Sequence, residues 1–310
     1  MTPILKVENL VKDFGSLRAV GGVSFAIEKG SVVGLLGPNG AGKTTCIDIL
    51  LGSTIPNGGS VEYFGQDFFT HKQAALARIN FASAYHNLQN RTSVRENLLV
   101  FACLYEVEKP GRKIDELLEY FEVTELGSRR YGDLSAGQRT RVMLIKSLMN
   151  DPELILMDEP TASLDPDIAD KTLSMIEDLR RDRELSILFT SHNMDEVDRI
   201  CDEVIFLDRG QVVASGTPSQ LTRTIPHAEL QMAFEGEPAS VMRYLDAANH
   251  VYRMPGESSV IVTTNERDIS QIIFDLRQMG TAITDVDVRK PDLEDVFLQI
   301  ARREHVTQES

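Results

Sequence analysis

Hydrophobic and polar positions along this chain follow two rhythms, which predict strands in some stretches and helices in others. Short apolar runs bounded by turn residues predict strands, whereas apolar positions three or four residues apart predict helices. In the first part of the chain this pattern predicts an antiparallel layer of strands, a buried strand and one helix. The antiparallel strands are expected at 4–11, 18–27 and 60–64, the buried strand at 31–36 and the helix at 43–51.

The middle of the chain changes from helices to alternating strands and helices. Helical spacing is expected at 94–105, 113–121 and 136–149, within a helical subdomain of about 84–150. Strands and helices then alternate through 154–207, with helices at 167–181 and 193–201, and a closing hairpin strand follows within 209–218. Alternation of this kind predicts a mainly parallel core sheet in an α/β fold.

The last part of the chain has the pattern of a separate small domain. We expect a first domain at 1–223, a linker at 224–229 and an accessory α+β domain at 230–310. The order of elements in the accessory domain, βαββαβ, suits a ferredoxin-like unit. These elements are expected at 229–234, 237–247, 249–253, 258–264, 267–279 and 282–289. A final helix, capped by Asp292, would dock an apolar stripe onto its own domain or onto a partner; the stripe is Leu293, Val296, Phe297 and Ile300.

The string GPNGAGKTT follows the buried strand and opens the first helix. It matches the phosphate-binding pattern GxxxxGK[ST] in the strand-to-helix context that this pattern requires. Gly37, Gly40 and Gly42 let the backbone turn tightly and point N–H groups at phosphates, while Lys43 reaches the terminal phosphates. The Thr44 hydroxyl can ligate Mg²⁺. The sequence therefore predicts an ATP site, and the remaining residues of its loop are Pro38, Asn39, Ala41 and Thr45.

Two later strings place carboxylates and a histidine at strand ends. LILMDEP ends with Asp158 and Glu159 before a proline, and ILFTSH ends with His192. Nucleotides bind at the carboxyl ends of strands in open α/β sheets. We therefore expect Asp158 to hold Mg²⁺, Glu159 to take a proton from the attacking water and His192 to hydrogen-bond the γ-phosphate. Taken alone, the acidic pair could be a solvated strand end and the histidine a structural one.

Together with TASLDP at 161–166 and LSAGQ at 134–138, these motifs resemble the nucleotide-binding subunits of ATP-binding cassette (ABC) transporters. The resemblance covers about residues 3–223. It implies a P-loop NTPase cassette with a mainly parallel core sheet, an antiparallel layer and a helical subdomain that carries LSAGQ. It also implies that the chain is an ATPase that uses ATP and Mg²⁺.

The same resemblance implies that an ATP site is completed by a second subunit. Ser135, Gly137 and Gln138 would cap the ATP bound by the opposite subunit, and Asp165 would link the two sites. Phe14 would stack on adenine, although it could also fill the core between strands. One phosphate loop and one signature in each chain imply a dimer, with a homodimer as the simplest form and a heterodimer left open.

The ending TAITDVDVRKPDLEDVFLQIARRE resembles the appendage of drug, sodium and antibiotic-resistance ABC exporter subunits, in which a separate chain forms the pore. This resemblance implies export driven through a separate transmembrane permease. Two alternatives stay open. One is a soluble ABC ATPase that remodels ribosomes or DNA, and the other is a degenerate cassette with a regulatory role.

One position departs from the family pattern. Without gaps, Ala84 stands where a glutamine normally contacts Mg²⁺ and the attacking water, and Gln89 lies five residues later. A methyl group can ligate neither a metal nor water. We therefore expect a water molecule, rather than Gln89, to take the place of the missing amide.

Composition limits the partners and the location of the protein. The formal net charge is −15, which disfavours nucleic acid as a partner. Apolar stretches stay far below the ~20 residues of a membrane span, and the start lacks the pattern of a signal peptide. The three cysteines lie far apart, as in a protein with reduced thiols. We therefore expect a cytoplasmic protein held at the inner face of the cell membrane by its permease.

Overall fold

The computed structural model describes residues 2–84, 88–162, 164–225 and 227–306 of the 310-residue chain. The chain forms two compact units, Met1–Pro218 and Ser219–Ser310. The first unit contains every sequence motif for phosphate chemistry. The proposed domain limit at residue 223 lies five residues beyond this division, just after α8 (Pro218–Thr222).

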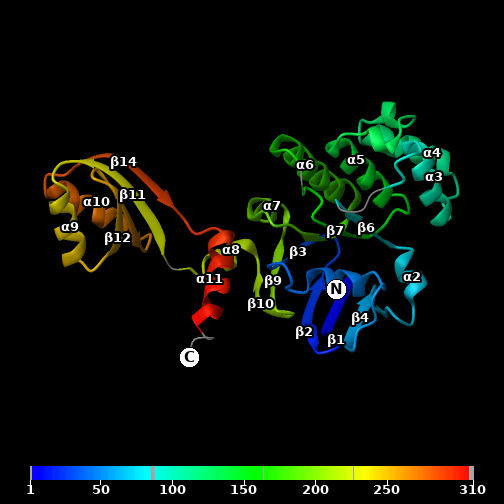
Figure 1. Ribbon diagram of the computed structural model, residues 1–310, viewed down its shortest axis with the longest axis horizontal. Helices are drawn as coiled ribbons and strands as arrows, with labels where there is room; N and C mark the ends of the chain where they lie inside the picture. The colour runs from blue at the N-terminus through cyan, green and yellow to red at the C-terminus, as the bar shows by residue number, and fades with distance from the viewer. Residues whose placement is uncertain (1, 85–87, 163, 226, 307–310) are drawn as a thin grey trace. The chain divides into compact units, whose positions relative to one another are not determined.

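The core of the first unit is a six-stranded sheet with the order β10-β9-β3-β8-β7-β6 (Figure 1). All neighbouring strands are parallel except β10, which pairs antiparallel with β9. The strands are β3 (Val32–Leu36), β6 (Ile79–Ser83), β7 (Leu154–Asp158), β8 (Ser186–Thr190), β9 (Glu203–Asp208) and β10 (Gln211–Gly216). The mainly parallel core that the sequence predicts is confirmed.

The order of the central strands determines which segments meet at the carboxyl edge of the sheet. β8 lies between β3 and β7, so the loops after these three strands emerge side by side at the carboxyl edge. The phosphate loop follows β3, His192 follows β8, and Asp158 is the last residue of β7. Three stretches of sequence that are far apart therefore meet at one edge of the sheet.

β6 was not anticipated from the hydrophobic pattern. Its sequence INFAS contains the polar residue Asn80, which is nevertheless buried. The Asn80 side chain can be buried because its amide group donates to Asn150 Oδ1 at 2.7 Å and its Oδ1 accepts from Phe81 N. β6 pairs parallel with β7, and Ser83 stands opposite Asp158. Satisfied side-chain hydrogen bonds thus allow a strand whose composition does not show alternation.

A second, antiparallel sheet has the order β2-β1-β4-β5. Its strands are β1 (Leu5–Phe14), β2 (Leu17–Ile27), β4 (Gly58–Tyr63) and β5 (Gln66–Asp67). Helix α1 (Lys43–Leu50) shares one apolar core with both sheets through Cys46, Ile49 and Leu50. This packing fixes the helix that begins at the phosphate loop.

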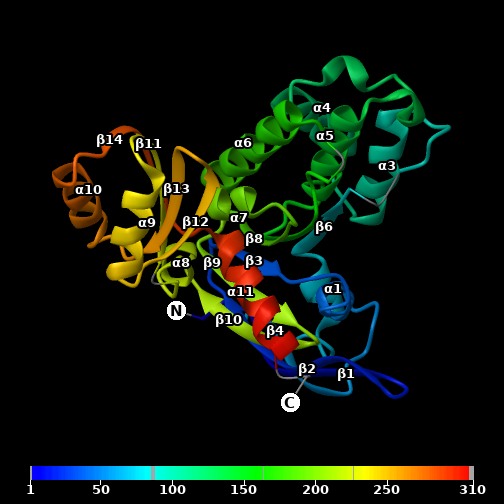
Figure 2. The same cartoon turned by 60° about the vertical axis from the view of Figure 1, so that its left-hand side comes forward.

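The helical subdomain consists of α3 (Val94–Leu104), α4 (Pro110–Tyr120) and α5 (Ala136–Ser147), with two short 3-10 turns. In Figures 1 and 2 these helices gather at the end of the first unit that lies away from β1, β2 and β4. Capping boxes start two of them, with Ser93 and Glu96 at α3 and Ser135 and Gln138 at α5. The remaining helices of the first unit are α2 (Lys72–Leu76), α6 (Pro166–Arg183) and α7 (Met194–Ile200).

The second unit contains the βαββαβ order that the sequence predicts, in a sheet of order β12-β13-β11-β14. Its elements are β11 (Ala228–Glu235), α9 (Pro238–Ala247), β12 (Val251–Gly256), β13 (Ser259–Thr264), α10 (Ile269–Gln278), β14 (Ala282–Arg289) and α11 (Leu293–Val306). Leu230, Val241 and Leu276 belong to its own apolar core. Asp292 caps α11, since its carboxylate accepts from Asp295 N at 2.9 Å, and Leu293 and Val296 are buried.

Candidate functional site

The phosphate loop can be formed only by glycine at its two ends. Gly37 and Gly42 have φ angles of 148° and 102°. A Cβ at Gly37 would lie 2.1 Å from the carbonyl oxygen of Leu207, and one at Gly42 would lie 2.4 Å from that of Ala19. Gly40 also has positive φ, but its Cβ would meet open space. The loop is therefore pressed against backbone on two sides, with Gly42 as the N-cap of α1.

The Lys43 side chain is held over this loop and near the acidic strand end. Its ammonium donates to the carbonyl oxygens of Gly37 at 2.6 Å and Pro38 at 3.2 Å. Burial lowers the pKa of Lys43 below its ordinary value, while the charges of Glu159 and Asp158 act in the opposite direction. The structure thus brings together the lysine and both carboxylates that the sequence singles out.

Thr190, the last residue of β8, holds the acidic strand end in place. Its hydroxyl donates to Asp158 Oδ1 at 2.8 Å and accepts from the backbone N–H of Glu159 at 3.0 Å. The backbone of Glu159 is in the left-handed region, with φ of 50°. Such a conformation in a residue other than glycine stores strain and is common at functional sites. Sequence reasoning missed Thr190, although it directly precedes the last two residues of ILFTSH.

Glu159 and His192 form a close pair at the edge of the core sheet. His192 Nε2 lies 2.5 Å from Glu159 Oε1. The Glu159 side chain is only 12% exposed, whereas that of His192 is 50% exposed. A nearly buried carboxylate with an accessible imidazole beside it can orient a water molecule and accept its proton.

Thr44 and Asp158 are the residues of this site that suit Mg²⁺. Thr44 is exposed and Asp158 is half-buried. Among the described residues, there is no cluster of three or more His, Cys, Asp or Glu side chains able to hold a metal ion. Mg²⁺ differs from most metals in needing only one or two protein ligands beside phosphate oxygens and water. The donor set therefore fits Mg²⁺ bound together with a nucleotide.

The signature residues form the start of α5. Ser135 Oγ accepts from Gln138 N at 3.3 Å, and Gln138 Oε1 accepts from Ser135 N at 3.1 Å. A Cβ on Gly137 would lie 2.6 Å from Ile168 Cγ2, so glycine allows close packing between α5 and α6. Asp165 is the N-cap of α6, and its side chain makes no capping hydrogen bond.

Phe14 ends β1 and is 51% exposed. The Lys12 ammonium lies 5.0 Å from the centre of its ring. A side chain with this exposure does not lie in the core of the chain. Adenine stacking stays a prediction.

Ala84 directly follows β6, whose last residue pairs with Asp158. The backbone of Gln89 is anchored at the start of α3, since Asn97 Oδ1 accepts from Gln89 N at 2.9 Å and Asn97 Nδ2 donates to Gln89 O at 3.0 Å. Residues 85–87 between them lie outside the described part of the chain. The two-way bond to Asn97 ties Gln89 to the helical subdomain.

A cavity of about 680 Å³ opens beside the Glu159–His192 pair. Thr161, Ser191 and Glu196 contribute to its wall, and none of them was singled out from the sequence. Their separate positions in the chain gave no signal, because the hydrogen bonds that join them form only in the folded protein.

The chain is similar in sequence to known proteins. Residues 20–162 match the family described as ABC transporter. The chain is 35% identical over 295 residues to the Nod factor export ATP-binding protein I of Rhizobium sp. (strain N33), covering 94% of this chain and 95% of that protein. It is 33% identical over 310 residues to the protein of the same name from Ralstonia nicotianae, covering 98% and 95%.

Solved structures agree with the fold of the first unit. An ATP-binding cassette of an ABC transporter superposes with a TM-score of 0.64 at 29% identity, covering 70% of this chain and 92% of that one. The ADP conformation of such a cassette superposes with a TM-score of 0.62 at 27% identity, covering 71% and 93%. With its phosphate loop, acidic strand end and histidine at one sheet edge, the chain belongs to the ATP-binding subunits of ABC transporters and is an ATPase.

Proposed function

We propose that this ATPase works as a dimer that encloses two molecules of ATP with Mg²⁺ and drives export through a separate membrane permease. The proposal rests on one observation: each chain has a single phosphate loop at Gly37 to Thr45 and a single signature at the start of α5. An ATP site built from both halves needs a second subunit, and a second copy of this chain is the simplest one.

The residues have separate roles in this proposal. The loop N–H groups and Lys43 bind the phosphates, Thr44 and Asp158 hold Mg²⁺, and Phe14 stacks on adenine. Mg²⁺ supplies charge neutralisation on the phosphate oxygens when it is bound. Glu159 accepts the proton of the attacking water, and His192 binds the γ-phosphate beside it. Across the dimer, the signature residues cap the phosphates of the partner, and Asp165 links the two sites.

The nearly buried position of the Glu159 side chain supports its role as the base. The 2.5 Å contact with His192 holds its carboxylate in one orientation. A fixed carboxylate can hold a water molecule in line with the γ-phosphorus, which is the main demand of phosphoryl transfer.

Helix α3 supports the pairing with a permease. Leu99, Val100 and Leu104 on this helix are 42%, 58% and 69% exposed. A cluster of apolar side chains of this kind marks a protein contact. Among the described residues, no helix has both the length and the hydrophobicity for a membrane span. We therefore place the protein in the cytoplasm, bound to the inner face of the membrane through its permease.

Export is the direction that the relatives support. Their names describe export ATP-binding proteins, and the alignment with them includes the second unit as well as the ATPase core. The C-terminal ending resembles exporter subunits in the same way. The permease selects the substrate, so the substrate stays outside this proposal.

Mixing two inactive variants tests the dimer. A Lys43→Ala chain lacks the phosphate contact, and a Ser135→Arg chain blocks the start of α5. A mixed dimer would contain one site with both lesions and one intact site. We expect ATPase activity to recover to about a quarter to a half of wild type if one intact site turns over, by the statistics of mixing. Light scattering with tagged chains verifies that mixed dimers form. If they form and stay inactive, the shared site is refuted.

A further inference from the structure

Glu196 is a buried carboxylate next to the catalytic edge of the sheet. It lies on α7 and is 6% exposed. Its Oε2 atom accepts two hydrogen bonds, from the hydroxyl of Thr161 at 2.7 Å and from the hydroxyl of Ser191 at 2.6 Å. Burying a carboxylate costs free energy unless donors of this kind satisfy it. The position between the two hydroxyl groups therefore requires a hydrogen-bond acceptor.

The two donors belong to the two segments that carry the Glu159–His192 pair. Thr161 lies two residues after Glu159, and Ser191 immediately precedes His192. Glu196 therefore joins these segments through Thr161 and Ser191, while Thr190 joins them at the strand ends. The Ser191 hydroxyl also accepts from the backbone N–H of Asn193 at 3.0 Å, which ties the start of α7 to the same point.

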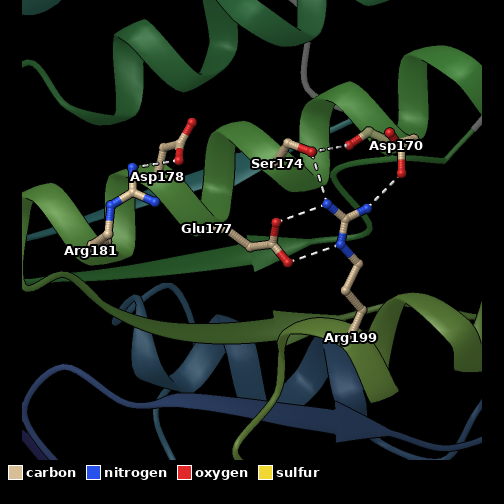
Figure 3. Close-up of polar contacts among 6 residues, drawn as sticks. All are labelled: Asp170, Ser174, Glu177, Asp178, Arg181 and Arg199. Atoms are coloured by element: carbon tan, nitrogen blue, oxygen red, sulfur yellow. Dashed lines mark hydrogen bonds and ion pairs between the residues drawn. The ribbon is translucent and has the colours of Figure 1, made fainter.

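The far end of α7 has a different attachment. Figure 3 shows Arg199 reaching from α7 to the side chains of α6. Its guanidinium donates to both carboxylate oxygens of Glu177, at 2.9 and 2.8 Å, to Asp170 at 2.7 Å and to Ser174 at 2.8 Å. The Arg199 contacts hold α7 to α6 and touch neither segment of the pair.

We propose that Glu196 is a positioning residue for ATP hydrolysis, which sets the distance and orientation of Glu159 relative to His192 through Thr161 and Ser191. The inference rests on the proposed roles of Glu159 and His192. A single oxygen that binds both hydroxyl groups keeps the two segments in a fixed relation. Loss of that oxygen leaves two hydroxyl donors without their acceptor and allows the pair to separate.

The experiment compares Glu196→Leu, Glu196→Gln and the matched control Glu177→Gln in the full-length protein. Leucine has a similar volume and no acceptor, so we expect kcat to fall about 10- to 100-fold while the ATP affinity stays within about threefold. Glutamine keeps a carbonyl oxygen at the same place and should restore most of the rate. Glu177→Gln weakens the attachment of α7 to α6 and should leave kcat within about twofold.

Two further variants keep the test decisive if Glu196→Leu does not fold. Thr161→Val and Ser191→Ala each remove one hydroxyl, and each should lower kcat about 3- to 10-fold with little change in ATP affinity. In a His192→Ala background, removal of either hydroxyl should cost no more than about twofold, because the pair is already broken.

Each other outcome overturns the inference in a recognisable way. If kcat is unchanged in the Thr161, Ser191 and Glu196 variants while Glu159→Gln is inactive, the positioning role of Glu196 is refuted and the proposed function stands. A parallel loss of ATP affinity, or an equal loss of rate in Glu177→Gln, identifies a general structural role. Wild-type turnover in Glu159→Gln would instead refute the proposed function itself.

Discussion

The phosphate loop and the Glu159–His192 pair lie at the same sheet edge but are built in opposite ways. The loop consists of backbone that is pressed against the carbonyl oxygens of Leu207 and Ala19, where a Cβ has no room. The pair consists of side chains that follow two strand ends. Thr190 donates a hydrogen bond to Asp158, and buried Glu196 accepts hydrogen bonds from Thr161 and Ser191, which lie beside the pair in the sequence. From this comparison we infer that the nucleotide-binding loop depends on backbone space, whereas the proposed hydrolytic pair depends on side-chain orientation.

The largest expected effect on ATP binding comes from adding a methyl group to the phosphate loop. Gly42→Ala would place a Cβ at about 2.4 Å from Ala19 O in a backbone conformation that disfavours alanine. We expect ATP affinity to fall more than about 100-fold, since the loop must shift. Gly40→Ala is the matched control for stability, because its Cβ meets open space, and it should cost only about 1 kcal/mol. Nucleotide titration and thermal unfolding of both variants measure the difference. Equal unfolding temperatures would contradict the steric account.

A second prediction concerns the charge that anchors α5. The Lys146 ammonium donates to Asn80 Oδ1 at 3.1 Å and to Phe81 O at 3.0 Å, and burial lowers the pKa of Lys146 to about 8. Between that value and its ordinary 10.5, the folded chain releases the proton while the unfolded chain retains it. The free energy of unfolding therefore rises with pH. Between pH 7 and pH 9.5 the total rise is about 2 kcal/mol.

Lys146→Met removes this titration and provides the control. The difference in unfolding free energy between wild type and variant should shift by that amount in favour of wild type as the pH rises. Chemical denaturation at several pH values measures it. Parallel pH profiles for the two proteins would show that Lys146 keeps an ordinary pKa.

The smallest expected effect belongs to Ala84, on the turnover side of the comparison. Ala84→Gln places a side-chain amide directly after Ser83, the residue that pairs with Asp158 between β6 and β7. This change should alter the ATPase rate by about two- to tenfold while leaving the ATP affinity nearly constant. Gln89→Ala should change neither, because Asn97 binds the backbone of Gln89 rather than its side chain. Steady-state kinetics with both variants decides the matter. A large loss of activity in Gln89→Ala would show that Gln89 is the working glutamine.

The loop was predictable from sequence because its physics is local. Its glycines, lysine and threonine are consecutive, and the flanking strand and helix follow from short-range pattern. The start of α5 was equally readable, since Ser135 and Gln138 have the spacing of a capping box. The order of elements in the second unit followed from periodicity as well.

The hydrogen bonds around the Glu159–His192 pair could not be predicted from local sequence patterns. The hydrogen bonds of Thr190 with Asp158 and of Thr161 with Glu196 form only when β7 and β8 pair and α7 packs beside them. β6 was missed for a related reason, since Asn80 is buried through long-range partners that the sequence does not mark. Long-range hydrogen bonds thus account for what the sequence left out.

The most direct test of the account is the separation of binding from turnover in Glu159→Gln. An amide can still hydrogen-bond water and His192 but cannot take a proton, so we predict ATP affinity within about threefold of wild type and a rate reduced at least about 100-fold. Size-exclusion chromatography with Mg-ATP should then show an ATP-bound dimer that persists. Wild-type turnover, or a loss of ATP binding as large as that of Gly42→Ala, would contradict the claim that the phosphate loop binds the nucleotide and the Glu159–His192 pair hydrolyses it.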